Sequence, residues 1–312
     1  MAAYLIRRLW QMVPTLFGVV LLVFLLFKGF GGDPAEILGG LNATPAQVDA
    51  IRAQLGLNQP LWVQFGIFLR QIVTFNWGQS WATQESVSHL FATRLPATLT
   101  VMTPILVLET LLAIPFAIGV ARVRGSLTDR AIMVATTLAL SVSFLVYVIV
   151  GQYVFAFQLG WFPVQGWSDS LWTNLRVYAP LPVLLAVLVS LAPQTRHYRT
   201  FFLDEIGHDY VRTARAKGLS ERAVLLRHVL RNALIPILTN VAVALPGLFV
   251  GSFLIEVFFS IPGLGRELLL AVNRSDYPVI QAFAIYTAVL TMLVNLATDV
   301  LYTLADPRVV LK

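Results

Sequence analysis

Apolar runs longer than a buried core helix needs are the feature that most constrains how this chain folds. Several of them exceed the roughly 18 residues that indicate a membrane-spanning helix. Because a bilayer offers the backbone no water, each run must satisfy its own N–H and C=O groups, as a helix does. We therefore predict an all-α integral membrane protein with about six transmembrane helices. These predicted spans cover Leu9–Phe27, Leu99–Ala121, Ala131–Phe157, Val177–Ala192, Ala233–Phe258 and Val279–Leu304.

Composition supports this prediction, since only 12% of the 312 residues are charged, against about 25% in soluble domains. A mean hydropathy of +0.76 excludes an ordinary soluble protein. The absence of cysteine excludes disulfides and thiol chemistry. Arg7 and Arg8 precede a first run longer than the roughly 7–15 apolar residues of a signal peptide, so we expect a retained first span. Prolines interrupt several runs, at Pro14, Pro104, Pro115, Pro182, Pro236 and Pro246.

Basic residues set the predicted orientation. With the N-terminus inside, most of the 22 lysines and arginines fall on the cytoplasmic side. They lie beside the first span, in the turn with Arg122, Arg124 and Arg130, in the segment 196–232, and in the tail with Arg308 and Lys312. The positive-inside rule therefore predicts that both termini are cytoplasmic. It also explains the net charge of +6 without any nucleic-acid partner.

The segment 29–98 between spans one and two is the long outer segment of this topology. Thr44 is a suitable N-cap ahead of Pro45, so a short helix is predicted over Ala46–Leu55. Leu61–Val73 is predicted to be an amphipathic helix with its aromatic residues on one face. That helix could rest on the bilayer surface or form part of an outer docking surface, and the two interpretations are compatible.

The cytoplasmic segment 196–232 is predicted to form a helix, a glycine turn and a second helix. The first helix is expected over Leu203–Lys217, and Gly218 occupies the position where a left-handed residue ends a helix. Ser220 is then a good N-cap for the second helix. Small and basic residues on the first helix suit a helix that docks into a partner's groove. The alternative is a solvated basic loop that only obeys the positive-inside rule.

The run Asp209-Tyr-Val-Arg-Thr-Ala-Arg-Ala-Lys-Gly-Leu219 resembles the coupling-loop motif of permease subunits of ABC importers. It is most similar to the dipeptide/oligopeptide/nickel branch, in which Arg212, Thr213 and Ala214 stand where the general pattern has Glu-Ala-Ala. Gly218 keeps its place after that triplet, whereas His228 to Arg231 replace the later Ile-x-Leu-Pro. Further branch-like stretches are Gly32–Pro34, Leu55–Leu57, Gly78–Ser80, Leu95–Thr98, Glu256–Gly265, Asp276–Val279 and Asp306–Arg308.

This resemblance implies a pore subunit of an ATP-driven importer in a bacterial or archaeal plasma membrane. It would pair with a second, similar permease, expected to be a different chain, with two cytoplasmic ATPase subunits and with an outer substrate-binding protein. This chain would bind no cofactor, because ATP and Mg²⁺ would sit on the ATPase partners. Short peptides are the expected substrates, with nickel or another small solute as the alternative. The residues expected to couple to the ATPases are Arg212, Thr213, Ala214, Arg215, Lys217, Gly218 and Leu219.

Carboxylates inside the predicted spans are the remaining candidate functional groups, because ionisable groups there usually face a partner or a wet cavity. Glu109 lies mid-span, where it could contact a substrate amine, relay a proton, or form an interhelical hydrogen bond. For Asp299 we expect the structural role. Glu256 resembles part of the family's gate region, although a solvated interfacial carboxylate is the alternative. Pro262 and Gly263 join Glu109 and Glu256 as translocation or gate candidates.

No catalytic motif is present in the sequence. None of the four histidines forms the HExxH pattern of zinc proteases, and no GxxxxGK[ST] loop could hold phosphates. We therefore expect a non-catalytic subunit, with ATP hydrolysis on another chain. Two other classes remain open: a secondary transporter that relays protons through Glu109 and Asp299, and a membrane enzyme. Six spans without a repeated half fit the secondary transporter poorly.

Overall fold

The computed structural model describes residues 2–40 and 43–305, which are almost entirely helical. Across these residues the only β-pairing is an isolated bridge between Gln79 and Ser86. The chain divides into two compact units: Met1–Pro96 with Gly263–Lys312 forms unit 1, and Ala97–Pro262 forms unit 2. The predicted cytoplasmic charges Arg308 and Lys312 lie outside the described residues.

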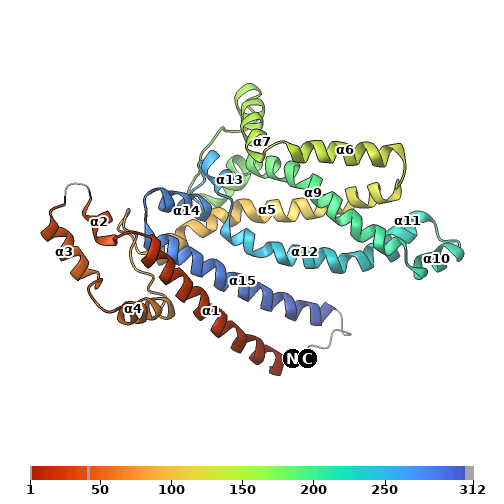
Figure 1. Ribbon diagram of the computed structural model, residues 1–312. Helices are drawn as coiled ribbons and strands as arrows, with labels where there is room; N and C mark the ends of the chain where they lie inside the picture. The colour runs from red at the N-terminus through yellow and green to blue at the C-terminus, as the bar shows by residue number, and fades with distance from the viewer. Residues whose placement is uncertain (1, 41–42, 306–312) are drawn as a thin grey trace. The chain divides into compact units, whose positions relative to one another are not determined.

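Unit 1 pairs the first and last long helices with a set of short helices from the outer segment. Its elements are α1 (Ala2–Phe30), α2 (Pro34–Gly39), α3 (Pro45–Gln54), α4 (Leu61–Val73), the start of α5 (Val87–Arg122), α14 (Leu264–Asn273) and α15 (Tyr277–Ala305). Helices α1 and α15 lie side by side, with α2, α3 and α4 beside one end of α1 (Figure 1). The predicted first and sixth spans are therefore each a single helix.

Helix α4 begins and ends at the predicted residues, and its aromatic face packs onto the first span. The ring of Phe65 lies 5.7 Å from that of Phe17 and 5.3 Å from that of Phe24, both edge-on. Phe68 also contacts Phe24, at 5.9 Å. Edge-on aromatic pairs are favourable beyond the area that they bury. This face of α4 is thus occupied by its own chain.

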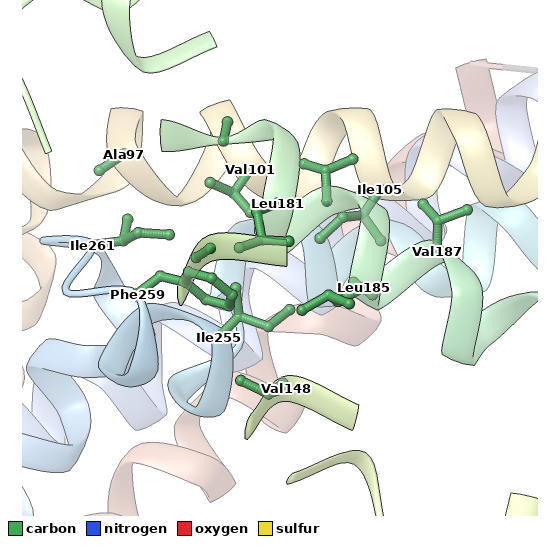
Figure 2. Packing of buried hydrophobic residues seen from close by; sticks show 14 residues of the cluster. Ala97, Val101, Ile105, Val148, Leu181, Leu185, Val187, Ile255, Phe259 and Ile261 are labelled. Carbon is green, nitrogen blue, oxygen red and sulfur yellow. The ribbon is translucent and has the colours of Figure 1, made fainter. Parts of the chain in front are cut away.

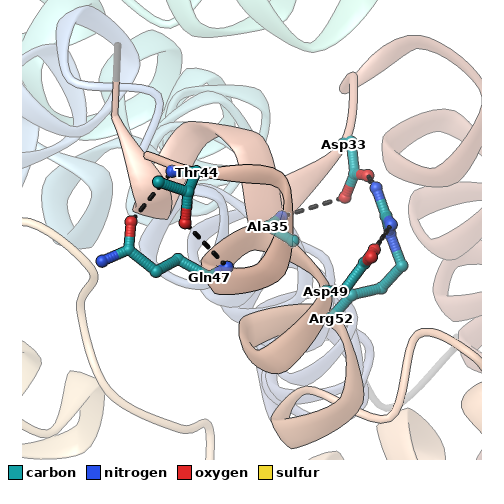
Figure 3. A network of polar contacts seen from close by, with 6 residues as sticks. All are labelled: Asp33, Ala35, Thr44, Gln47, Asp49 and Arg52. Carbon is teal, nitrogen blue, oxygen red and sulfur yellow. Dashed lines mark hydrogen bonds and ion pairs between the residues drawn. The ribbon is translucent and has the colours of Figure 1, made fainter. Parts of the chain in front are cut away.

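The short outer helices are held by local polar contacts (Figure 3). Thr44 and Gln47 form a capping box at the start of α3, which confirms the predicted N-cap followed by Pro45. Asp33 caps α2 through the Ala35 N–H at 2.9 Å and also accepts hydrogen bonds from the Arg52 guanidinium. The ion pair of Asp33 with Arg52 fastens α3 to the start of α2.

Unit 2 contains the remaining spans and the cytoplasmic segment. Its elements are the rest of α5, α6 (Leu127–Ser141), α7 (Phe144–Gly151), the π-helical η1 (Gln152–Gln158), α8 (Leu171–Thr173), the π-helical η2 (Asn174–Tyr178), α9 (Pro180–Ile206), α10 (Asp209–Ala216), α11 (Glu221–Ala223), the π-helical η3 (Val224–Val229), α12 (Leu230–Val250) and α13 (Phe253–Phe258). One buried core joins α5, α7, α9 and α13, with Val101, Leu185, Ile255 and Phe259 at its centre (Figure 2).

The structure corrects the predicted spans at two bends. The third span is broken by 86° between α6 and α7. Val142 is extended there, and the Ser143 hydroxyl caps α7 by accepting from the Leu145 N–H. The fourth span bends by 56° before Pro180. Among the described residues, four helices are long and apolar enough to cross a membrane, or up to six if each bent pair is one span, which agrees with the six predicted.

Candidate functional site

The segment 196–232, predicted to be cytoplasmic, is less of a loop than expected, because α9 continues through Arg196 as far as Ile206. The expected single helix over Leu203–Lys217 is wrong: the backbone of His208 is extended and separates α9 from α10. Helix α10 starts at Asp209, a carboxylate that suits the positive end of a helix. The candidate coupling residues therefore lie on a separate short helix and the turn after it (Figure 1).

Gly218 has the predicted left-handed backbone, with φ at +80°. Its N–H donates to the Arg215 carbonyl at 2.9 Å and ends α10. A Cβ at this position would meet nothing within 4 Å, so only the backbone conformation requires glycine. Ser220 then caps α11 by accepting from the Ala223 N–H, as predicted. The Arg215 guanidinium reaches across the turn to Glu221, with Nε 2.7 Å from Oε1.

The candidate coupling residues divide into one buried residue and an exposed set. Ala214 is only 4% exposed and belongs to a buried cluster with Val211, Tyr198 and Phe202. It therefore packs on its own chain and is not available to a partner. The other candidates, Arg212, Thr213, Arg215, Lys217, Gly218 and Leu219, are all exposed. Together they form the coupling surface.

The buried cluster below the coupling surface joins four parts of unit 2. Helix α5 contributes alanines spaced by four residues, α9 contributes Tyr198 and Phe202, and η3 and α12 supply aliphatic side chains. Tyr210 adds a polar tie, because its hydroxyl donates to the carboxylate of Glu205 at the end of α9. Helix α10 thus packs mainly on η3 and shares one buried cluster with α5, α9 and α12.

Glu109 lies at a polar junction between spans. Its half-buried carboxylate faces the polar side chains of Ser190 and Gln194 of α9. Gln194 donates in turn to Asn240 of α12 at 3.2 Å, and Tyr198 approaches the same Asn240 oxygen at 3.4 Å. No local pattern points to these partners, because they lie more than 80 residues from Glu109 and neutral polar residues occur in most helices.

Glu256 is buried inside unit 2 at 1% exposure, which contradicts the alternative of a solvated interfacial carboxylate. The Thr98 hydroxyl donates to its Oε1 at 2.9 Å. Gly251, at φ +81°, separates α12 from α13 and leaves the space that this carboxylate occupies. Pro262 is the last residue of unit 2, and Gly263 is the extended N-cap of α14 in unit 1.

Asp299 takes the structural role expected for it. Its carboxylate lies 3.2 Å from Arg8 Nε and accepts the Tyr4 hydroxyl at 2.9 Å, both on α1. These contacts join α1 to α15. Within the described residues, no group of three histidine, cysteine or carboxylate side chains could hold a metal ion.

The outer end of unit 1 carries a cavity of about 600 Å³ whose lining contains no charged residue. Glutamine amides and indoles dominate its polar lining, including Gln64, Gln71, Trp77, Trp81, Gln84 and Gln281. The buried carboxylate of Asp276 holds one wall, because it accepts the Ser80 hydroxyl and the Trp81 N–H.

Comparison with known proteins decides the family. Residues 113–311 match the model of the binding-protein-dependent transport system inner membrane component, and residues 1–102 match its N-terminal companion. The chain belongs to this family. It is a multi-pass inner-membrane permease component.

Relatives match over 99% of both chains. A putative peptide transport system permease protein of Brucella abortus is 36% identical. The oligopeptide transport system permease protein AppB of Bacillus subtilis is 34% identical, and the di/tripeptide transport system permease protein DppB of Pseudomonas aeruginosa is 35% identical.

Proposed function

We propose that this chain is the pore-forming permease subunit of an ATP-driven importer of short peptides. The observation that carries the proposal is full-length similarity to several permeases that are each named for peptide transport. Helix α10 and its exposed glycine turn support a role in receiving force from a cytoplasmic partner, because α10 shares a buried cluster with three spans. Nickel and other small solutes remain outcomes of the test.

In this proposal the complex contains two ATPase subunits, one of which binds the coupling surface of this chain, and ATP with Mg²⁺ stays on those subunits. Their closure moves α10, and the buried cluster passes that movement to α5, α9 and α12. A rigid element of this kind is needed, because a ligand shifts a conformational equilibrium only through contacts that differ between states. This chain contributes no catalytic group to the hydrolysis.

An outer substrate-binding protein delivers the peptide, and a second, different permease completes the pore. The outer segment 29–98 with its uncharged cavity is the proposed docking region for the binding protein. Glu109 is the proposed pore-lining group, since its carboxylate suits a peptide's terminal amine. The neighbouring polar side chains of Ser190 and Gln194 would help to orient it for that contact.

The test is purification of the complex from its native membrane, followed by reconstitution in liposomes. We expect co-purification of two ATPases and a second permease, and uptake of labelled di- and tripeptides that requires ATP and the binding protein. Uptake of nickel complexes but not peptides would assign the alternative substrate. Uptake driven by a proton gradient without ATP would contradict the proposed function and favour the secondary transporter.

A further inference from the structure

Helix α6 is attached to the coupling assembly differently from its neighbours. The buried cluster that holds α10 takes side chains from α5, α9, η3 and α12, but none of its described members comes from α6. Helix α6 nevertheless packs along α9 (Figure 1). Polar contacts near the start of α6 add to this packing.

The main polar contact is an ion pair between Asp129 and Arg199. The Arg199 Nη2 nitrogen lies 2.8 Å from both carboxylate oxygens of Asp129. The side chains of Asp129 and Arg199 are 9% and 16% exposed, so this ion pair is largely buried. Buried pairs are screened little by salt, and breaking one leaves an uncompensated charge.

Each partner of this pair is fixed on its own element. The Asp129 carboxylate also accepts a hydrogen bond from the Gly125 N–H at 2.9 Å, and the backbone N–H of Asp129 donates to the capping hydroxyl of Ser126. It thereby secures the turn between α5 and α6. On α9, Arg199 lies between Tyr198 and Phe202, both of which are fully buried in the coupling cluster. The pair thus links the first turn of α6 directly to the helix that leads to α10.

We infer that Asp129 and Arg199 are positioning residues that fasten α6 to the coupling assembly, so that α6 moves together with α10 during transport. This inference rests on the proposed function, in which α5, α9 and α12 move with α10. It adds α6 to that moving group and names the two residues that attach it. A second contact, from Arg196 to the Thr137 hydroxyl at 3.2 Å, is exposed and contributes less. Without the ion pair, α6 no longer moves together with α10, and less peptide is transported for each ATP hydrolysed.

The absence of cysteine allows a direct distance measurement. Spin labels are placed at Leu127→Cys on α6 and Leu226→Cys on η3, which are 82% and 46% exposed and lie outside the coupling surface. In the reconstituted complex, we expect the same distance between labels in the nucleotide-free and ATP-bound states. A distance that changes with nucleotide in the otherwise unaltered chain would overturn the inference.

Variants then test the ion pair itself. Arg199→Met removes the charge, and Asp129→Asn removes it while an amide oxygen can still accept the Gly125 N–H. For both variants we expect the distribution of distances between the two spin labels to become broader. We also expect the ratio of peptide transported to ATP hydrolysed to fall by roughly 2- to 30-fold, the range found for residues that couple two sites. Because Arg199 contacts Asp129 through one nitrogen, Arg199→Lys is expected to keep both properties near wild type.

A purely structural role would lower assembly without changing transport per ATP. An unchanged ratio and an unchanged distance distribution in Arg199→Met would overturn the inference. Failure of the proposed function looks different, because the unaltered complex would then show no ATP-dependent peptide uptake at all. The width of the distance distribution in Arg199→Met still decides whether the pair holds α6, even in that case.

Discussion

At the residue scale, Gly218 is required for its backbone and not for its size. Valine cannot hold φ near +80° without strain, which costs about 1–2 kcal/mol or more. We expect Gly218→Val to insert normally but to lose most transport, whereas Gly218→Asn, which tolerates this conformation, retains it. ATP-dependent peptide uptake per inserted complex measures the effect. Ala216→Val is the matched control, since Ala216 is exposed with helical backbone. Full transport by Gly218→Val would contradict this account of the turn.

The ion pair of Asp33 with Arg52 gives a prediction about pH. The Arg52 guanidinium, mainly through its hydrogen bonds, holds the pKa of Asp33 below its ordinary value. Since the folded pKa is lowered, the stabilisation is complete above the unfolded value of about 3.9 and is lost as pH falls through the folded pKa. The protection of the α2 and α3 amides against hydrogen exchange should therefore stay constant between pH 5 and 8, once the exchange rates are corrected for the intrinsic rate at each pH. Protection in Asp33→Asn should be weaker throughout, and a midpoint near neutrality in the unaltered chain would refute this assignment.

At the element scale, the break between α12 and α13 depends on Gly251. A Cβ there would lie 2.3 Å from Glu256 Oε1 and 2.8 Å from the Thr98 methyl carbon, and φ is positive. We expect Gly251→Ala to lower the thermal midpoint of the purified complex clearly. Gly247→Ala, with nothing within 4 Å and a helical backbone, should leave it unchanged. Thr98→Val removes a donor to a buried carboxylate and should cost about 1–3 kcal/mol. Equal midpoints for the two alanine variants would show that the break tolerates a side chain.

Helix α4 is expected to depend on its aromatic contacts with α1. Phe65→Ala removes the ring that meets both Phe17 and Phe24, so protection of residues 61–73 against hydrogen exchange should fall. Trp62→Ala, on the same helix but 77% exposed, is the control and should change little. Unchanged protection in Phe65→Ala would mean that something other than its own first span holds α4.

The elements that sequence could predict are those with local signals. Length and apolar content located the spans, capping residues located the starts of α3 and α11, and amphipathic spacing located α4. Proline alone does not predict where the helices break, because the 56° bend precedes Pro180 whereas other prolines lie inside continuous helices. Helices α1, α9 and α12 run through Pro14, Pro193, Pro236 and Pro246, while Ser143 and Gly251 mark the breaks. Whether a helix breaks at a given residue depends on the neighbouring helices, which can satisfy the freed backbone groups. The partners of Glu109, Asp129 and Glu256 are also tertiary contacts, so no local sequence pattern predicts them.

At the scale of the whole molecule, the orientation in the membrane remains a prediction from basic residues alone. It requires the turn before α6 to be cytoplasmic and the segments near Gln59 and Trp161 to be outside. Because the chain has no cysteine, a single cysteine introduced at one of these exposed positions is its only reactive thiol, so labelling shows on which side of the membrane that position lies. In intact cells we expect a membrane-impermeant maleimide to label Gln59→Cys and Trp161→Cys, and to label Leu127→Cys only after permeabilisation. The opposite pattern would place α10 outside, where no ATPase could reach it, and would remove the basis for coupling in both proposals.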